Sequence, residues 1–362
     1  MKIAIIHDWL INFGGAELVL KRITELYPDA DIYTLVYRKK TMGREFPVVH
    51  TSYIQKFPFA DRLYSKYLPF FAKAVEAFDL SEYDLVISSS TCCAKGVLTR
   101  ADAVHVCFCA TPMRYAWDFY YEYKNHASPL FRWLIPHYMH KVRLWDALSS
   151  MRVDAFMANS KNVSRRIKKH YRRESTVVYP FGNTDFFTPL EHPSEDYYFV
   201  VTRLVSYKRI DLAIRACEKL GRKLIIAGTG GEEKNLRKIA GPNTIFVGRC
   251  SNEELRGYYQ NCKAFLFPGE EDFGITPVEA QACGRPVIAF GKGGALETVI
   301  DGETGIFFDE QTEESLCDAI LRLESMTFSK DRIRENSLRF SRDEFDKNFT
   351  AAVDAALEEA KK

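Results

Sequence analysis

Short apolar runs rich in β-branched residues alternate with helical patterns along almost the whole chain, and this alternation limits the fold more than any other feature. The first half contains the runs KIAIIHDW, DIYTLVY, YDLVISS and AVHVCFC, with a predicted helix at 16–26. Near-continuous apolar strands separated by helices are typical of a parallel sheet covered by helices on both faces. The sequence therefore predicts an α/β fold of the doubly wound, Rossmann-like kind.

The same pattern occurs twice. After DAFMANS and STVVYP, the segment FGNTDFFTPLEHPSED at 181–196 loses periodicity and gathers glycine, proline and acids, which is typical of a linker. From Tyr197 the alternation resumes with YYFVVTRL, KLIIAGTG, TIFVGR, AFLFPG and PVIAF. We therefore predict Rossmann-like domains at 1–183 and 184–341 that face a cleft, and an amphipathic helix at 342–362 that packs back on the first domain.

Composition argues against several classes of protein. The formal net charge is only +2, so we expect no nucleic-acid partner, and we interpret the basic run at 164–173 as a solvated helix face. No apolar stretch approaches the roughly 20 residues of a membrane-spanning helix, and MKIAIIHDWL becomes polar too early for a signal peptide. The spacing of the cysteines fits neither a disulfide framework nor a zinc site. We expect a cytoplasmic protein with reduced, mostly buried cysteines.

Ligands of open parallel sheets bind at the carboxyl ends of the strands, where loops lead into helices. In the first half, Gly14 and Gly15 follow a strand and precede a helix, which suits the close approach of an anion. A tight turn explains this pair equally well. In the second half, Arg203 and Lys208 follow a strand and suit a diphosphate, although ordinary surface charges are the alternative.

Two acids lie in the stretch PGEEDFGITPVEAQAC. We predict Glu271 in the loop after a buried strand and Glu279 in the first turn of a helix, with Thr276 as N-cap and Pro277 at the first helical position. One carboxylate can accept hydrogen bonds from both hydroxyls of a vicinal diol. Two acids and two cations therefore indicate a nucleotide-sugar site. The alternative is that Glu279 favours the helix dipole and Glu271 is a loop charge.

Several segments resemble the retaining glycosyltransferases of family 4, which adopt the glycosyltransferase B fold. They are RLVSYKRID, AGTGGEEKNLR and the long stretch from VGRCSNEELRGYYQ to DGETGIFF, together with GGAE near the start and FMANSKNVSRRI in the middle. The resemblance implies that Arg203 and Lys208 hold the diphosphate, Glu279 the ribose and Glu271 the donor sugar. It also implies donor contacts by Gly14, Gly15, Arg249, Phe273, Gly274, Ile275 and Thr276.

The segment TPMRYAWD at 111–118 resembles the subgroup that transfers mannose or a related sugar from GDP-sugars in polysaccharide or lipopolysaccharide assembly. The resemblance implies a metal-independent, retaining transfer to a lipid-linked or oligosaccharide acceptor, with GDP-mannose as the expected donor and no cofactor. The residues agree on the metal, because no Asp-x-Asp pair follows a strand near the predicted cations.

Ala110 departs from the family pattern. Relatives commonly have a histidine immediately before TPMRY, close to the donor sugar, where this chain has alanine. The chain is therefore either an inactivated variant or one that works without this imidazole. A catalytically silent nucleotide-sugar-binding protein and a nucleotide-sugar epimerase of the same fold are the alternative functions. We interpret His105, in the preceding strand, as a structural histidine.

The stretch 117–145 is dense in aromatic and basic residues. This composition suits the headgroup region of an anionic membrane, so we expect peripheral contact with the inner face of the cytoplasmic membrane. A pair of core helices is the alternative. We expect four polar residues near the acceptor, without assigned roles: Arg114, Asp118, Arg143 and Asp146.

Overall fold

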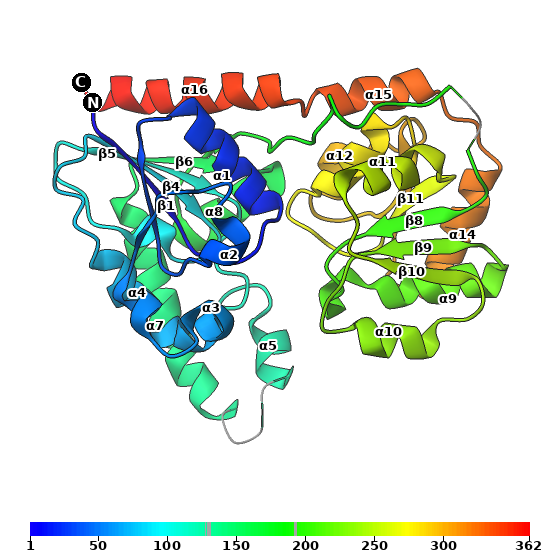
Figure 1. The fold of residues 1–362 in the computed structure, drawn as a ribbon, viewed down its shortest axis with the longest axis horizontal. Helices are drawn as coiled ribbons and strands as arrows, with labels where there is room; N and C mark the ends of the chain where they lie inside the picture. The colour runs from blue at the N-terminus through cyan, green and yellow to red at the C-terminus, as the bar shows by residue number, and fades with distance from the viewer. Residues whose placement is uncertain (127, 129–131, 192–193) are drawn as a thin grey trace. The chain divides into compact units, whose positions relative to one another are not determined.

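The computed structural model describes residues 1–126, 128, 132–191 and 194–362. Residues 127 and 129–131, which belong to the aromatic and basic stretch, lie outside the described part of the chain. The structure divides into two compact units (Figure 1). The first unit contains Met1–Val178 and Asp346–Lys362, and the second contains Tyr179–Phe345.

The first unit is built on a seven-stranded parallel sheet with the order β3-β2-β1-β4-β5-β6-β7. Its strands are β1 (Ile3–His7), β2 (Asp31–Thr34), β3 (His50–Thr51), β4 (Leu85–Ser90), β5 (Val104–Cys109), β6 (Ala155–Ala158) and β7 (Thr176–Val177). Strands β4 and β5 are buried along their whole length, which explains why their sequences are almost continuously apolar or small.

Helices accompany this sheet. They are α1 (Gly15–Leu26), α2 (Lys39–Met42), α3 (Ala60–Leu63), α4 (Leu68–Glu76), α5 (Tyr120–His126), α7 (Leu134–Ser149) and α8 (Lys161–Tyr171), with a 3-10 turn η3 (Ala94–Gly96). The end of α16 (Arg342–Glu359) also belongs to this unit and lies beside α1 (Figure 1). Phe349 of α16 packs on Tyr27 and Phe108, and Arg22 of α1 donates to Asp346 at 2.8 Å.

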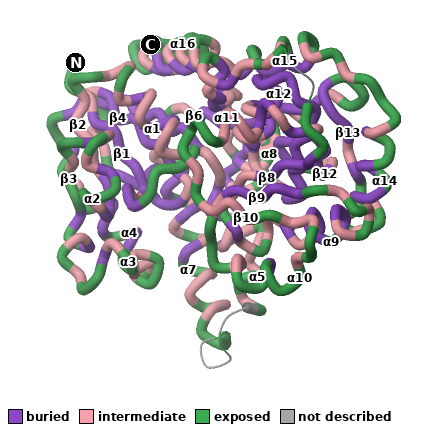
Figure 2. The backbone as a smooth tube through the Cα atoms, turned by 45° about the vertical axis from the view of Figure 1, so that its right-hand side comes forward, coloured by how far each residue is buried: buried purple, intermediate pink, exposed green. Residues whose placement is uncertain are grey.

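The second unit is built on a six-stranded parallel sheet with the order β10-β9-β8-β11-β12-β13. Its strands are β8 (Tyr198–Val201), β9 (Leu224–Ala227), β10 (Thr244–Gly248), β11 (Ala264–Phe267), β12 (Val287–Phe290) and β13 (Gly305–Phe308). Figure 2 shows β8 and β12 as buried tubes, in the same way as β1 and β4 of the first sheet.

Alternate side chains of these strands enter two separate cores. Tyr198 and Val200 pack with α9 (Ile210–Leu220), α10 (Glu233–Ile239) and α14 (Glu313–Glu324). Phe199 packs on the opposite face with α11 (Asn252–Asn261), α12 (Ile275–Ala282) and α13 (Ala295–Thr298). The last helix of this unit before α16 is α15 (Lys330–Leu338). Because side chains alternate across a strand, a sheet buried on both faces needs apolar residues at consecutive positions.

The described part of the predicted linker at 181–196, which lacks residues 192–193, belongs to the second unit. Phe181 contacts Phe345 with ring centroids 5.3 Å apart, and Phe187 contacts Tyr259 at 5.3 Å. Tyr179 packs on Phe340 at 5.3 Å. The structure therefore divides the chain after Val178 and Phe345, rather than at the predicted positions 183 and 341, because these aromatic residues bury their rings in the second unit.

Candidate functional site

The carboxyl edge of the second sheet brings Lys208 and Glu271 together. Lys208 lies in the 3-10 turn η5 (Ser206–Lys208) after β8, and Glu271 lies in the loop after β11, the strand next to β8. The ammonium group of Lys208 forms an ion pair with Glu271 Oε1, and the two side chains are 14% and 21% exposed. Both residues line a small pocket above Val200, Phe265 and Phe267. The predicted cation and the predicted acid thus neutralise one another here.

The loop that carries Glu271 is held close to η5 by its backbone. A Cβ atom at Gly269 would lie 2.8 Å from Lys208 Cα and 2.9 Å from the Tyr207 carbonyl oxygen, so only glycine permits this approach. On the other side, the Glu271 carbonyl accepts a hydrogen bond from Gly294 N–H at 2.8 Å. The loop after β12 therefore holds the backbone of Glu271 through a contact that the sequence pattern does not predict.

Helix α12 begins at Ile275, so the prediction of Thr276 as N-cap and Pro277 as the first helical residue was wrong. Gly274 is the N-cap, with φ of 93°. A turn with this positive φ favours glycine, and a Cβ atom would also lie 2.8 Å from the Phe267 ring. The helix starts immediately after this turn. Glu279 consequently lies in the second turn of α12 and not in the first.

Glu279 occupies a poorly solvated position in α12. Its Oε2 accepts a hydrogen bond from the Tyr259 hydroxyl of α11 at 3.0 Å. Desolvation raises the pKa of the Glu279 carboxyl to about 7, and the Tyr259 hydrogen bond opposes this shift only in part. A perturbed carboxyl of this kind, at the ligand-binding edge of a parallel sheet, is a candidate functional group.

The other predicted donor residues of the second unit differ in exposure. Arg203 is exposed after β8, with Nη2 3.5 Å from the Tyr207 hydroxyl, and Arg249 is exposed after β10. Ile275 and Thr276 are partly exposed in the first turn of α12. The side chain of Phe273 is only 3% exposed because it packs on Tyr179 and Phe340. Phe273 is therefore a core residue, and its ring presents no surface to a ligand.

In the first unit, Gly14 and Gly15 lie at the start of α1, at the carboxyl end of β1. Both are exposed, and Gly14 is the N-cap with φ of −150°, an extended conformation that any residue can adopt. The glycine is therefore not required by backbone strain. No side chain caps the first turn of α1 in the described part of the chain.

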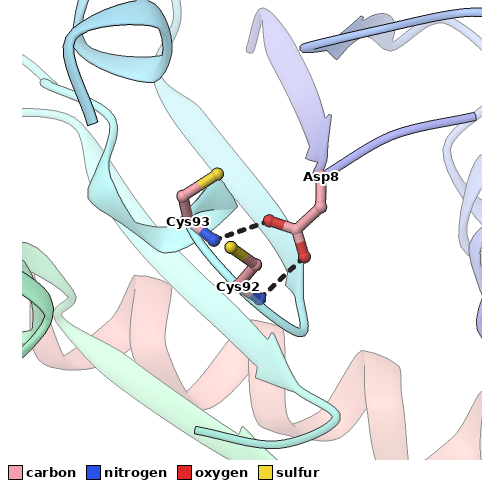
Figure 3. Close-up of side chains that lie close together, drawn as sticks. All are labelled: Asp8, Cys92 and Cys93. Atoms are coloured by element: carbon pink, nitrogen blue, oxygen red, sulfur yellow. Dashed lines mark hydrogen bonds between the residues drawn. The ribbon is translucent and has the colours of Figure 1, made fainter. Parts of the chain in front are cut away.

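Asp8 follows β1 and binds the loop after β4 (Figure 3). Its Oδ1 accepts hydrogen bonds from the backbone N–H groups of Cys93 and Ala94, both at 2.7 Å. Its Oδ2 accepts from the N–H and hydroxyl of Thr91 at 2.6 and 2.9 Å and from Cys92 N–H at 2.9 Å. The buried carboxylate therefore fixes the residues that precede η3.

Asp8, Cys92 and Cys93 are close enough together to be compared with a metal centre. Their chemistry does not fit one, because five donors already occupy the two oxygens of Asp8. Cys92 Sγ contacts the Tyr115 hydroxyl at 2.9 Å, and burial raises the pKa of the Cys93 thiol well above its usual value. All nine cysteines of the chain are free thiols, eight of them buried, as the sequence predicted.

Ala110 follows β5 at the carboxyl edge of the first sheet, as Asp8 follows β1. Its N–H donates to the Ser90 carbonyl at 2.9 Å. His105, in the same strand, is fully buried and bonded to Ser88 Oγ at 2.8 Å. Burial lowers the pKa of His105 to about 4, so this residue is a neutral structural histidine. The position of the family histidine is thus occupied by a partly exposed methyl group.

Asp118 lies in the segment after Ala110 and pairs with α8. Arg166 Nε donates to Asp118 Oδ2 at 2.9 Å and Nη1 donates to Thr111 Oγ1 at 2.9 Å, while His170 Nε2 lies 3.5 Å from Asp118 Oδ1. Desolvation opposes ionisation, but His170 and Arg166 lower the pKa of Asp118 to about 2. Part of the basic run at 164–173 therefore holds this segment instead of forming only a solvated face.

The remaining residues predicted near an acceptor do not form one cluster of accessible polar groups. The guanidinium of Arg114 lies 4.7 Å from the Phe119 ring, and that of Arg143 lies 4.9 Å from the Tyr120 ring and donates to the Ala116 carbonyl. Asp146 is fully buried and bound to Lys95 at 2.6 Å. Asp146 therefore cannot contact an acceptor at the surface, contrary to the prediction.

Sequence reasoning missed the residues that support these groups. Tyr259 reaches Glu279 from another helix, and Lys95 reaches Asp146 across 51 positions of the chain. Lys95 had one visible signal, because it is a single charge in the otherwise apolar or small segment SSSTCCAKGVL. A charged residue in such a segment is normally buried together with a partner.

Most of the second unit is similar in sequence to a known protein family. Residues 183–340 match the family model described as "Glycosyl transferases group 1". The chain is 33% identical over 138 residues to a GDP-mannose-dependent alpha-(1-6)-phosphatidylinositol monomannoside mannosyltransferase of Mycolicibacterium smegmatis, covering 33% of this chain and 36% of that protein. It is 27% identical over 221 residues to O-antigen chain mannosyltransferase C of Escherichia coli, covering 55% and 57% of the two chains.

A solved structure of Anabaena HepE in complex with UDP matches with a TM-score of 0.74 at 18% identity, covering 98% of this chain and 100% of that one. This likeness shows that the fold is the glycosyltransferase B fold, as the sequence predicted. The chain spans about half of the length of the curated relatives that it matches, from 36% to 57%. Residues 183–340 therefore resemble the group 1 glycosyltransferases in sequence.

Proposed function

We propose that the chain is a retaining, metal-independent glycosyltransferase that moves a hexose, with mannose from GDP-mannose as the leading candidate, to a saccharide or lipid-linked acceptor in cell-surface glycan synthesis. One observation carries this proposal. The Lys208–Glu271 pair and the poorly solvated Glu279 lie at the carboxyl edge of the sheet within the domain that matches the glycosyltransferase family. The names of the mannosyltransferase relatives support mannose as the sugar.

The chemistry of these residues supports donor binding without a metal. In the proposed complex, a donor diphosphate displaces Glu271 from Lys208 and accepts hydrogen bonds from Lys208 and Arg203. Glu271 is then released to accept hydrogen bonds from sugar hydroxyls, and the two oxygens of Glu279 accept from the ribose diol. The cations stabilise the negative charge that develops on the leaving diphosphate.

Ala110 favours a second candidate function. If the imidazole found in relatives is needed for turnover, this chain binds a nucleotide sugar without transferring it. The two candidates differ in one measurable property, because only the enzyme consumes its donor. An epimerase would convert the donor sugar without any acceptor.

The first experiment is isothermal titration calorimetry with GDP-mannose, UDP-glucose and UDP-N-acetylglucosamine on the chain and on Glu279→Ala. We expect selective binding of GDP-mannose that Glu279→Ala weakens by about tenfold or more, because the variant loses both acceptor oxygens. Glu253→Ala is the matched control, since Glu253 is an exposed acid of the same unit. Lack of binding to all three donors would contradict the proposed site.

Donor turnover is followed in the same samples, with and without Ala110→His. Release of GDP that increases with the histidine supports an enzyme weakened at this position. Binding without release in either protein supports the silent binding function, and a converted but still nucleotide-linked sugar supports the epimerase.

A further inference from the structure

A buried ion pair lies beneath the carboxyl edge of the first sheet. Lys95 of η3 is 1% exposed and Asp146 of α7 is 0% exposed. Lys95 Nζ donates to Asp146 Oδ1 at 2.6 Å and to Ser149 Oγ at 3.0 Å. Burial alone would lower the pKa of Lys95, but the Asp146 carboxylate raises it above its usual value.

The pair is connected to the segment that follows Ala110. Asp146 Oδ2 accepts a hydrogen bond from the indole N–H of Trp117 at 2.7 Å. We call Lys95, Asp146 and Trp117 the Lys95 network. The Trp117 ring stacks on His170 at 4.6 Å, and the neighbouring Asp118 pairs with Arg166.

Both ends of the network are fixed. Asp8 binds the backbone of Thr91–Ala94, which immediately precedes Lys95. Arg166 links Asp118 to Thr111 Oγ1, so that the segment 111–118 is held at its first and last residues as well as through the Trp117 indole. A buried ion pair is costly, and apolar residues of similar size often give equal stability. Stability of the fold alone is therefore a weak explanation for this pair.

We infer that the Lys95 network positions the segment 111–118, which begins immediately after Ala110, for the transfer reaction. Lys95, Asp146 and Trp117 are positioning residues, because they act through the backbone of this segment and Asp146 is inaccessible to substrates. The segment lies where open parallel sheets bind their ligands. This inference rests on the proposed function.

The test compares two hydrogen bonds to the same carboxylate. Trp117→Phe removes the indole donor but keeps an aromatic ring beside His170. Tyr171→Phe is the matched control, because the Tyr171 hydroxyl donates to Asp146 Oδ2 at 2.9 Å from α8 and not from the segment. Each variant thus removes one side-chain donor to Asp146.

Two readouts are used, both on the full chain. Hydrogen–deuterium exchange of peptides covering 111–118 reports whether the segment is held. We expect faster exchange in Trp117→Phe and unchanged exchange in Tyr171→Phe. We also expect GDP release from GDP-mannose to fall by roughly 10- to 100-fold in Trp117→Phe at unchanged donor Kd, because misplacement of active-site groups has effects of this size.

Unchanged exchange in Trp117→Phe would overturn the inference, as would altered exchange with normal GDP release. An equal loss of GDP release in Tyr171→Phe would assign the effect to general destabilisation and overturn it too. Donor binding by the unmodified chain distinguishes a failure of this inference from a failure of the proposed function. If GDP-mannose does not bind, the proposed function and the role in transfer both fail, whereas exchange still decides whether the network holds the segment.

Discussion

The residue with the clearest electrostatic signature is Glu279. Burial raises the pKa of this carboxyl to about 7 from an ordinary value of 4.5, and Tyr259 supplies a single hydrogen bond. Between these two values the folded chain binds a proton that the unfolded chain releases. The free energy of unfolding contributed by Glu279 is therefore highest below about pH 4.5 and decreases as the pH rises through about 7.

Glu279→Gln should remove this pH dependence, because glutamine has a similar shape and no titratable proton. As the pH rises from about 5 to about 8, we expect the free energy of unfolding of the variant to increase by up to about 3 kcal/mol relative to that of the original chain. Urea denaturation at both pH values measures the difference. Glu253→Gln, on an exposed acid, should show no such gain. If the free energy of unfolding changed with pH in the same way in Glu279→Gln and in the original chain, the raised pKa would not belong to Glu279.

At the scale of elements, the position of Glu271 depends on the contact between two loops. Gly269→Ala would place a Cβ atom 2.8 Å from Lys208 Cα, so the loop after β11 must move away from η5. We expect the ion pair to separate and the Kd for GDP-mannose to rise by about tenfold or more. Calorimetry on a variant whose circular dichroism is unchanged measures this effect.

Gly257→Ala is the matched control for that change. Gly257 lies within α11, and a Cβ atom there meets no other atom within 4 Å. This variant should bind the donor normally and gain about 0.5–1 kcal/mol of helix stability. Equal affinity in the Gly269 and Gly257 variants would show that the loop contact does not matter for binding.

The sequence predicted whole elements better than it predicted the positions of individual polar residues. Strands such as β8 and β12 were predicted because a sheet buried on both faces leaves a continuous apolar run. The start of α12 was wrong because a positive φ at Gly274 decides it. Asp146 was misplaced because its partner Lys95 is brought near only by the tertiary fold. Local patterns predict elements, but long-range pairs decide which polar residues are accessible.

At the scale of the whole molecule, the described residues contain no helix that is long and apolar enough to cross a membrane. One helix nevertheless presents apolar residues to solvent. Trp133 is 72% exposed before α7, and Leu144 and Leu148 of α7 are 51% and 61% exposed. Lys141 is exposed on the same helix, whose single acid, Asp146, is buried. This combination suits the surface of an anionic membrane.

The prediction for this surface is binding to vesicles that contain anionic lipid. The bound fraction in a sedimentation assay should decrease as salt is added, because screening weakens the attraction of basic side chains. Leu148→Ser should reduce the partition coefficient by about tenfold through loss of apolar burial. Leu321→Ser, on an exposed leucine of the second unit, is the control. Binding that ignores both lipid charge and Leu148 would contradict peripheral attachment through α7.

The first unit consists of two separate segments of the chain, and this has a consequence for biosynthesis. Phe349, Val353 and Ala356 of α16 are buried in a unit whose other residues all precede Tyr179. Domains usually fold in the order in which they leave the ribosome. Here the unit that emerges first cannot complete its core until residues 346–362 have been made, after the entire second unit. The nascent first unit must therefore keep an apolar surface exposed while the rest of the chain is translated.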